Sequence, residues 1–516
     1  MTEPMDNSCK NRRIARNAAA LYIRMFLLMA ISLYTSRVIL QVLGVEDFGI
    51  FGVIAGFVAL FGVLSRSLSS AASRFLNFEL GKCDGGNAEK LRGVFSTIFV
   101  IHLLMAVLIV VLGEPIGYWF VHHQMNVPTE RLTATMWVFH FSVINFCINL
   151  LIVPFNAAII AHEKMSVFAY ISLFEGIAKL LMCFLVIHSP FDHLIYYVGL
   201  TVVVQLIIVV VYYLYSKWQF SECTLFAKND RQTIRDITSF AGWNIIGSSS
   251  AILVNQGCNI LLNLYGGGLV VNAARTISNQ VQHAVHGFIE NFITAVKPQI
   301  TQSYAAGNLN YMMMLVLTGA RLSYYLMLFV CLPLLLNADF ILHAWLTEVP
   351  NYSVEFVQWT LAYILVESLS GTLITAQLAT GIIRNYQLLV GGLQLLNLPV
   401  GYLMLILGCS PLSIYYAALA FAVICLVARI YMLSSTMKFS ARAFIIQVLG
   451  RVAVTTIVVS FPLILYTRFH PTDCWTDALQ NVILCILINA LVIYVVGCTQ
   501  RERSTIRMYL RKIINQ

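Results

Sequence analysis

Long runs of apolar residues recur along almost the whole chain, separated by short polar segments. A helix needs about 20 apolar residues to cross the hydrocarbon core of a membrane, so each run predicts a transmembrane helix. Segment 237–263 is the most polar of them, with several Asn, Ser and Gln residues. The predicted spans are 18–43, 49–73, 92–113, 133–154, 167–187, 194–215, 237–263, 269–295, 312–336, 355–376, 386–407, 411–432, 448–466 and 479–497. The fold class is therefore an all-α polytopic membrane protein with about fourteen transmembrane helices.

The spans also repeat, at an offset of about 220 residues. The first and seventh both end in a short turn with glycine, at Gly44 and Gly266, and the turns at 161–164 and 381–384 are alike. Six helices in each copy give a parallel repeat, which predicts two lobes around a central cavity. The predicted parts are an N-terminal six-helix lobe at 1–215, a cytoplasmic linker at 216–236, a C-terminal six-helix lobe at 237–432, and helices 13 and 14 with a basic tail at 433–516.

Composition agrees with this class and excludes several others. Hydrophobic residues make up 59% of the chain and charged residues only 11%, whereas soluble domains carry about a quarter charged residues. No phosphate-binding glycine loop, CxxC pair or metal-ligand spacing occurs. No loop has room for a catalytic domain. We therefore expect neither an enzyme nor a cofactor nor a metal site.

The basic residues follow the positive-inside rule. With the N-terminus inside, the predicted outer loops hold only Arg131 and Arg468, whereas the cytoplasmic segments hold most of the lysines and arginines, Arg429 included. Both termini are thus predicted to be cytoplasmic. The net charge of +9 faces the anionic inner leaflet and does not indicate nucleic-acid binding.

Nine ionisable residues remain inside the spans, where a charge costs about 3 kcal/mol and commonly marks function. They are Arg24, Arg37, Arg66, Lys179, Arg275, Arg321, Glu175, Glu290 and Glu367. Arg37, Arg66 and Glu290 lie near span ends and could extend to the interface. Glu175 and Lys179 are four residues apart and could pair with each other. The basic surplus predicts a cavity that attracts an anion.

Span 269–295 carries a polar stripe on one helical face. Its members are Asn272, Arg275, Asn279, Gln282, His286 and Glu290. Span 237–263 carries a weaker stripe with Asn244, Ser248, Asn255 and Asn259. Such stripes either line a hydrated cavity or bond helices to each other. We favour the cavity, and arginine suits phosphate because its planar fork binds two oxygens.

Two stretches carry a family resemblance. The chain reads LGVEDFG at 43–49 and PFNAAIIAHEK at 154–164. These stretches and the topology resemble Wzx-type polysaccharide flippases of the multidrug/oligosaccharidyl-lipid/polysaccharide exporter (MATE-like) superfamily. The resemblance implies alternating access and a polyprenyl-diphosphate-linked oligosaccharide as cargo, for capsule, O-antigen or exopolysaccharide synthesis at a bacterial inner membrane. Membrane lipids and the polysaccharide polymerase or export machinery are the implied partners.

The resemblance implies that Arg24 and Arg275 bind the diphosphate, and the polar stripes and buried carboxylates supply the other candidates. Substrate binding is expected of Arg24, Arg275, Asn279, Gln282, His286, Arg321, Arg37, Arg66, Asn255 and Asn259, and ion coupling of Glu175, Lys179, Glu367 and Glu290. Three alternatives remain open. They are a peptidoglycan-precursor flippase, a multidrug exporter with a more acidic cavity, and a polymerase or glycosyltransferase. The last typically needs a large outer loop, and the longest outer segments here, 114–131 and 338–353, are short.

Overall fold

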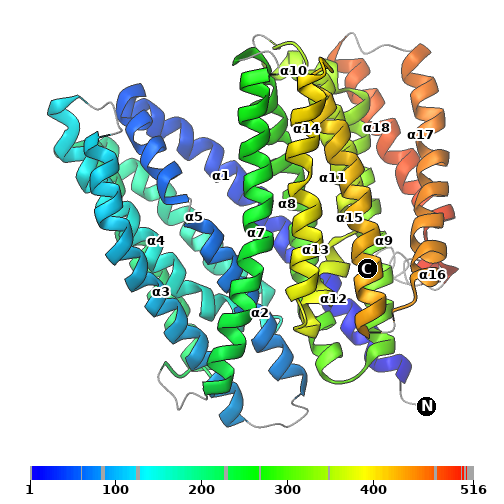
Figure 1. The fold of residues 1–516 in the computed structure, drawn as a ribbon, viewed down its shortest axis with the longest axis horizontal. Helices are drawn as coiled ribbons and strands as arrows, with labels where there is room; N and C mark the ends of the chain where they lie inside the picture. Colours follow the sequence, from blue (N-terminus) through cyan, green and yellow to red (C-terminus); the bar gives the residue numbers. More distant parts are fainter. Residues whose placement is uncertain are drawn as a thin grey trace. The chain divides into compact units, whose positions relative to one another are not determined.

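The computed structural model describes residues 3–59, 61–82, 88–123, 128–225, 231–265, 269–346, 349–437, 439–469, 474–500, 502–504 and 507. These residues form helices joined by short turns, and no strand occurs among them (Figure 1). The all-α fold class predicted from the apolar runs is confirmed.

The chain divides into two compact units, one of Met1–Ser248 with Thr301–Asn308 and the other of Ser249–Ile300 with Leu309–Gln516. The first unit contains α1 (Glu3–Ala59), α2 (Gly62–Lys82), α3 (Ala88–His123), the 3-10 turn η1 (Thr129–Arg131), α4 (Leu132–Ala161), α5 (Met165–Ile187) and α6 (His193–Gln219). Within it, α4 packs against α3 and α6, and α1 packs against α5. Figure 1 shows α3 and α4 side by side.

Two long helices take part in both units. They are α7 (Arg231–Tyr265), whose first half belongs to the first unit, and α8 (Leu269–Ala305), whose last residues do. The second unit continues with α9 (Leu309–Leu336), α10 (Ala338–Trp345), α11 (Ser353–Ser368), α12 (Gly371–Thr380), α13 (Arg384–Leu395), α14 (Asn397–Ile406) and α15 (Ser413–Met437).

The C-terminal pair also belongs to the second unit. It consists of α16 (Ala441–Phe444), the π-helical segment η2 (Ile445–Gly450), α17 (Arg451–Phe469), α18 (Trp475–Val492) and the π-helical segment η3 (Ile493–Gly497). Both α17 and α18 pack against α9. The lobe and linker bounds predicted from the repeat stay a prediction.

Each predicted span overlaps a helix or a broken helix pair, but not every helix is apolar enough to be counted as a span. By length and composition, 10 described helices could cross a membrane, or 11 if the pair α11 and α12, bent by 41°, is one span. Helix α8 is not among them, which agrees with the polar stripe predicted for it. The chain is a multi-span membrane protein, and the count of fourteen stays a prediction.

Several predicted boundaries are wrong. The span expected at 49–73 is broken, because α1 ends at Ala59 and α2 begins at Gly62. The outer segments expected at 114–131 and 338–353 are partly helical, since α3 continues to His123 and α10 lies within the second.

Gly44 separates the two halves of α1. Its φ of 76° and ψ of 172° lie inside an otherwise helical run. Only glycine adopts this region without strain, because it has no Cβ. The turn expected after the first span is therefore confirmed.

We expect Gly44→Ala to lower the free energy of unfolding by about 1–2 kcal/mol. A Cβ at Gly44 would meet no atom within 4 Å, so the effect isolates the backbone conformation. Gly242→Ala is the matched control, because Gly242 lies inside α7 with equally open space and an ordinary φ. It should stabilise the protein slightly. Thermal unfolding of the two purified variants checks that the unfolding temperature falls in Gly44→Ala and rises in Gly242→Ala. Equal changes in unfolding temperature would contradict a strained backbone at Gly44.

Candidate functional site

Arg275 is the centre of the polar cluster in the second unit. It lies on α8 and is only 8% exposed. Its Nε donates to Oδ1 of Asn259 at 2.5 Å, and a terminal nitrogen lies 3.4 Å from both the backbone and the side-chain oxygen of Asn255. The guanidinium also lies 5.7 Å from the ring centroid of Tyr415 on α15. The two polar stripes predicted on neighbouring spans therefore meet at Arg275.

All of these partners are neutral. Among the described residues, no carboxylate lies within ion-pair distance of Arg275. The amide oxygens of Asn255 and Asn259 solvate the cation without cancelling its charge. The hydroxyl of Tyr415 is held 2.9 Å from Oγ of Ser278, which keeps the ring in place. The cluster is a buried positive site with fixed surroundings.

The rest of the stripe continues along α8 toward its C-terminal half. Asn279, Gln282 and His286 are half-buried, and Glu290 is exposed. Nδ1 of His286 lies 3.6 Å from Oε1 of Glu290, one helical turn further on. The side chain of Asn272 lies outside the described part of the chain. Polarity thus extends well beyond Arg275 itself.

A second cluster in the first unit brings together candidates from distant parts of the sequence. Nζ of Lys179 donates to Oε1 of Glu175 at 2.6 Å, which confirms that these neighbours pair. Gln205 on α6 donates to the same oxygen at 2.9 Å. Arg24 on α1 interacts electrostatically with Glu175 and Tyr212. Its guanidinium lies 4.3 Å from the ring centroid of Phe168.

Arg24 still has unused hydrogen-bonding capacity. Its Nε is buried and has no hydrogen-bond partner in the described part of the structure. Arg24 belongs to one compact unit and Arg275 to the other. The spacing of Glu175 and Lys179 predicted their contact, but nothing in the sequence indicated that Arg24 and Gln205 would join them.

Arg321 and Glu367 each have a counter-charge that the sequence did not reveal. Arg321 on α9 is paired with Glu502, 181 residues away, and also donates to the carbonyl of Gln447 at 3.3 Å. Glu367 on α11 interacts electrostatically with Arg429 on α15. Arg321 is therefore neutralised by an ion pair, and Arg429 has a carboxylate in its surroundings.

The charge pattern counts Arg429 with the connecting segments, but the structure places it inside a helix. Arg429 is only 6% exposed inside α15 and donates to Oγ of Ser370 at 2.8 Å. Its position within the predicted span 411–432 was the signal that could have revealed this burial. Of the other candidates, Arg66 is exposed on α2, and the side chain of Arg37 lies outside the described part of the chain.

A family model identifies the chain. The model described as "Polysaccharide biosynthesis protein" matches residues 14–304, which is more than half of the sequence. The chain belongs to this family. Among curated proteins, no sequence matches this chain.

Solved structures show that this polysaccharide biosynthesis protein has the MATE transporter fold. A MATE in complex with MaD3S has a TM-score of 0.70 at 14% identity, over 83% of this chain and 97% of that chain. An outward-facing multidrug resistance MATE transporter of the MOP superfamily has a TM-score of 0.71 at 12% identity, over 83% and 97%. A MOP superfamily transporter from Pyrococcus furiosus has a TM-score of 0.65 at 12% identity, over 82% and 96%. The MATE-like fold that the resemblance implied is confirmed.

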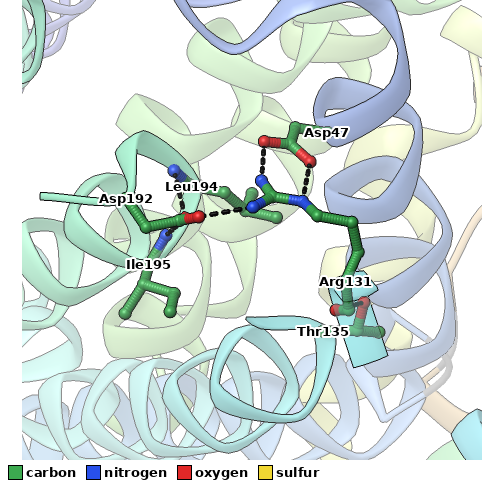
Figure 2. Close-up of polar contacts among 6 residues, drawn as sticks. All are labelled: Asp47, Arg131, Thr135, Asp192, Leu194 and Ile195. Atoms are coloured by element: carbon green, nitrogen blue, oxygen red, sulfur yellow. Dashed lines mark hydrogen bonds and ion pairs between the residues drawn. The ribbon is translucent and has the colours of Figure 1, made fainter. Parts of the chain in front are cut away.

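The first family-like stretch, LGVEDFG, forms a polar contact at one end of the first unit (Figure 2). Arg131 forms a forked pair with both oxygens of Asp47 and also bonds Oδ2 of Asp192. Asp192 caps α6 by accepting from the backbone N–H groups of Leu194 and Ile195, each at 3.1 Å. One arginine therefore ties the turn inside α1 to the starts of α4 and α6.

The second stretch, which ends in AHEK, packs against residues of α2 and α8. Nε2 of Gln302 donates to the carbonyl of Ala161 at 2.7 Å and to Oδ1 of Asn77 at 3.3 Å. A Cβ at Gly81 would lie 2.4 Å from the carbonyl oxygen of Gln302, so the close approach requires glycine. His162 pairs with Glu222. Burial opposes ionisation of Glu222, but the hydrogen bond from His162 brings the pKa of that carboxyl below its usual value.

The Asp192 contact predicts a pH-dependent stability. Burial opposes its ionisation, yet the α6 backbone N–H groups and Arg131 hold the pKa of Asp192 below its usual value. Its contribution is therefore present above the unfolded pKa of about 4 and is lost as pH falls through the folded pKa. We expect Asp192→Asn to destabilise the protein by about 1 kcal/mol at pH 7, and this difference should shrink as pH falls below about 4.

Thermal unfolding from pH 7 down to pH 3 measures this difference. Glu130→Gln is the control, because Glu130 is an exposed carboxylate next to Arg131 with no ion pair in the described chain. An equal loss of stability at pH 7 in Asp192→Asn and Glu130→Gln would refute the specific role of Asp192.

Proposed function

We propose that this protein is a flippase that moves a polyprenyl-diphosphate-linked oligosaccharide repeat unit across a bacterial inner membrane by alternating access. The family and the fold are those of membrane flippases and exporters. The lipid-linked cargo and its use in capsule, O-antigen or exopolysaccharide synthesis are the proposed part. Both termini are proposed to be cytoplasmic, and the polysaccharide polymerase or export machinery is the proposed partner. We propose no catalytic role.

The observation that carries this proposal is the uncompensated charge of Arg275. Lys179 is paired with Glu175 and Arg321 with Glu502, whereas Arg275 has only amide and aromatic partners among the described residues. A buried cation without a counter-ion raises the local potential and favours an anionic ligand. A diphosphate supplies that charge, and a guanidinium can bind two of its oxygens at once.

The remaining candidates fill supporting roles in the proposal. Arg24 has a donor without a partner in the described structure, and its binding of the diphosphate is proposed from sequence. Asn255 and Asn259 orient Arg275, while Asn279, Gln282 and His286 offer hydrogen bonds to hydroxyl groups of the sugar. Arg37, Arg66 and Arg321 stay proposed substrate contacts from sequence alone. Glu175 with Lys179, Glu367 and Glu290 are proposed to couple transport to an ion.

A cation exporter of the same fold is the rival function. It would favour an acidic pocket, and the buried charge of Arg275 opposes that. One matching transporter, from Pyrococcus furiosus, is itself described as having a binding pocket of reversed polarity that suggests a different function. Pocket charge is therefore a sound basis for separating the two functions.

Replacing Arg275 tests the proposed cargo. We expect Arg275→Ala to abolish surface polysaccharide in cells that depend on this chain, because the diphosphate loses its charged partner. Arg275→Lys should retain part of the activity, since it keeps the charge and loses the fork. Arg231→Ala is the control, because Arg231 is an exposed cation at the start of α7. Quantified surface glycan, normalised to the amount of folded protein in the membrane, is the measurement.

Two outcomes would contradict the site. Normal glycan in a well-expressed Arg24→Ala/Arg275→Ala double variant would remove both arginines from the mechanism. Drug efflux that persists in Arg275→Ala, together with unchanged surface glycan, would support the cation exporter.

Replacing Glu367 tests the proposed coupling. Glu367→Gln keeps the hydrogen-bonding shape but removes the charge that faces Arg429. If Glu367 carries a proton during transport, the rate of transport into vesicles by Glu367→Gln should depend less on pH than that of the unchanged protein. The variant should still be present in the membrane in a normal amount. Unchanged rates and an unchanged pH profile would limit Glu367 to neutralising Arg429.

A further inference from the structure

A pocket outside the proposed substrate site lies at one end of the C-terminal helix pair. It has a volume of about 520 Å³ and lies where η2 passes into α17 and where η3 ends. Ile446, Gly450 and Arg451 line one side, and Val496, Cys498 and Arg503 line the other. All of them belong to the second compact unit.

Two π-helical segments form the walls of the pocket. Ile446 and Gly450 lie within η2, and Val496 lies within η3. A π-helical turn holds an extra residue, which widens the helix and redirects the next side chain. Arg451 follows η2 directly, so the π turn sets the position from which its side chain leaves the helix. Such segments are rare and frequently mark functional sites.

The charge in the pocket is positive and has no local compensation. Arg451 and Arg503 line it, and none of its described lining residues is acidic. The nearby carboxylate of Glu502 is paired with Arg321. Arg451 has no ion-pair partner among the described residues. The Nε of Arg503 donates to the carbonyl of Cys498 at 3.2 Å and a terminal nitrogen donates to the carbonyl of Val495, which fixes the guanidinium beside the end of η3.

The surface next to the pocket is apolar and exposed. Ile446 is 58% exposed and Val454 51%, and the exposed row continues along α17 through Ile457 and Phe461. Residues 454, 457 and 461 are three and four apart, so they share one helical face. In a multi-span protein, such a face contacts hydrocarbon. A ligand in the pocket would thus have its charged part at the arginines and its apolar part along α17.

We propose that this pocket binds the phosphate of an anionic phospholipid, with the acyl chains lying along α17. Basic pockets at the ends of transmembrane helices suit anionic headgroups. The apolar row beside the pocket favours a lipid over a free phosphate ion. The inference does not depend on the proposed flippase function, because the pocket contains none of the candidate substrate residues.

Lipid binding to the purified full-length protein tests the proposal. Dioleoyl phosphatidylglycerol should raise the unfolding temperature in detergent and remain bound in native mass spectrometry, whereas dioleoyl phosphatidylcholine should do neither. In Arg451→Gln the affinity for phosphatidylglycerol should fall about tenfold, because one charged contact is lost. Arg451→Lys should keep part of it, which separates loss of charge from misfolding.

Arg442→Gln is the matched control. Arg442 is an exposed cation on α16, near the pocket in sequence but not part of its lining. Its loss should leave the affinity unchanged. Three results would overturn the proposal. The first is an equal loss of affinity for phosphatidylglycerol in Arg442→Gln and Arg451→Gln. The others are a rise in unfolding temperature with phosphatidylcholine, or with inorganic phosphate alone, that equals the rise with phosphatidylglycerol. The last would assign the pocket to a free anion.

Discussion

The need to compensate every buried charge inside the protein shapes this membrane fold. In hydrocarbon no water is available to solvate an ion, so each ionised side chain must find a partner on another helix or face a wet space. The structure meets this need by pairing Lys179 with Glu175 and Arg321 with Glu502, and by placing Arg429 near Glu367. The pair of Lys179 with Glu175 lies within α5, and Gln205 on α6 donates to the same carboxylate. The Arg321 pair joins α9 to the C-terminal segment, and Arg429 with Glu367 brings α15 near α11. Charge compensation thus also holds helices together.

Arg275 is the exception, and its surroundings explain how a bare cation is tolerated. Two asparagine side chains on α7 and the ring of Tyr415 on α15 satisfy the guanidinium without neutralising it. The cost of burial is reduced, yet the positive potential persists. A site of this kind binds an anion more tightly than a site with a fixed counter-ion, because no internal ion pair must first be broken.

The family-like stretches serve a different purpose from the arginine. Asp47 of the first stretch anchors Arg131, and the end of the second stretch supplies the carbonyl of Ala161 to Gln302. Gln302 lies at the end of α8, the helix that also carries Arg275. Both stretches therefore position helices, and the second stretch contacts the C-terminal end of α8. Their contacts hold helices in place, whereas the charge at Arg275 supports the proposed anionic cargo.

The sequence by itself determined the features that depend on near neighbours in the chain. Apolar runs predicted the helices, and Gly44 predicted the turn in α1. Helical spacing predicted the polar stripe on α8 and the contact between Glu175 and Lys179. Only the tertiary structure decided which distant groups meet. Glu502 lies 181 residues from Arg321, and Arg429 is buried inside α15 rather than exposed in a connecting segment. A contact between remote helices leaves no periodic signal in the chain, because its partners are chosen by packing and not by sequence separation.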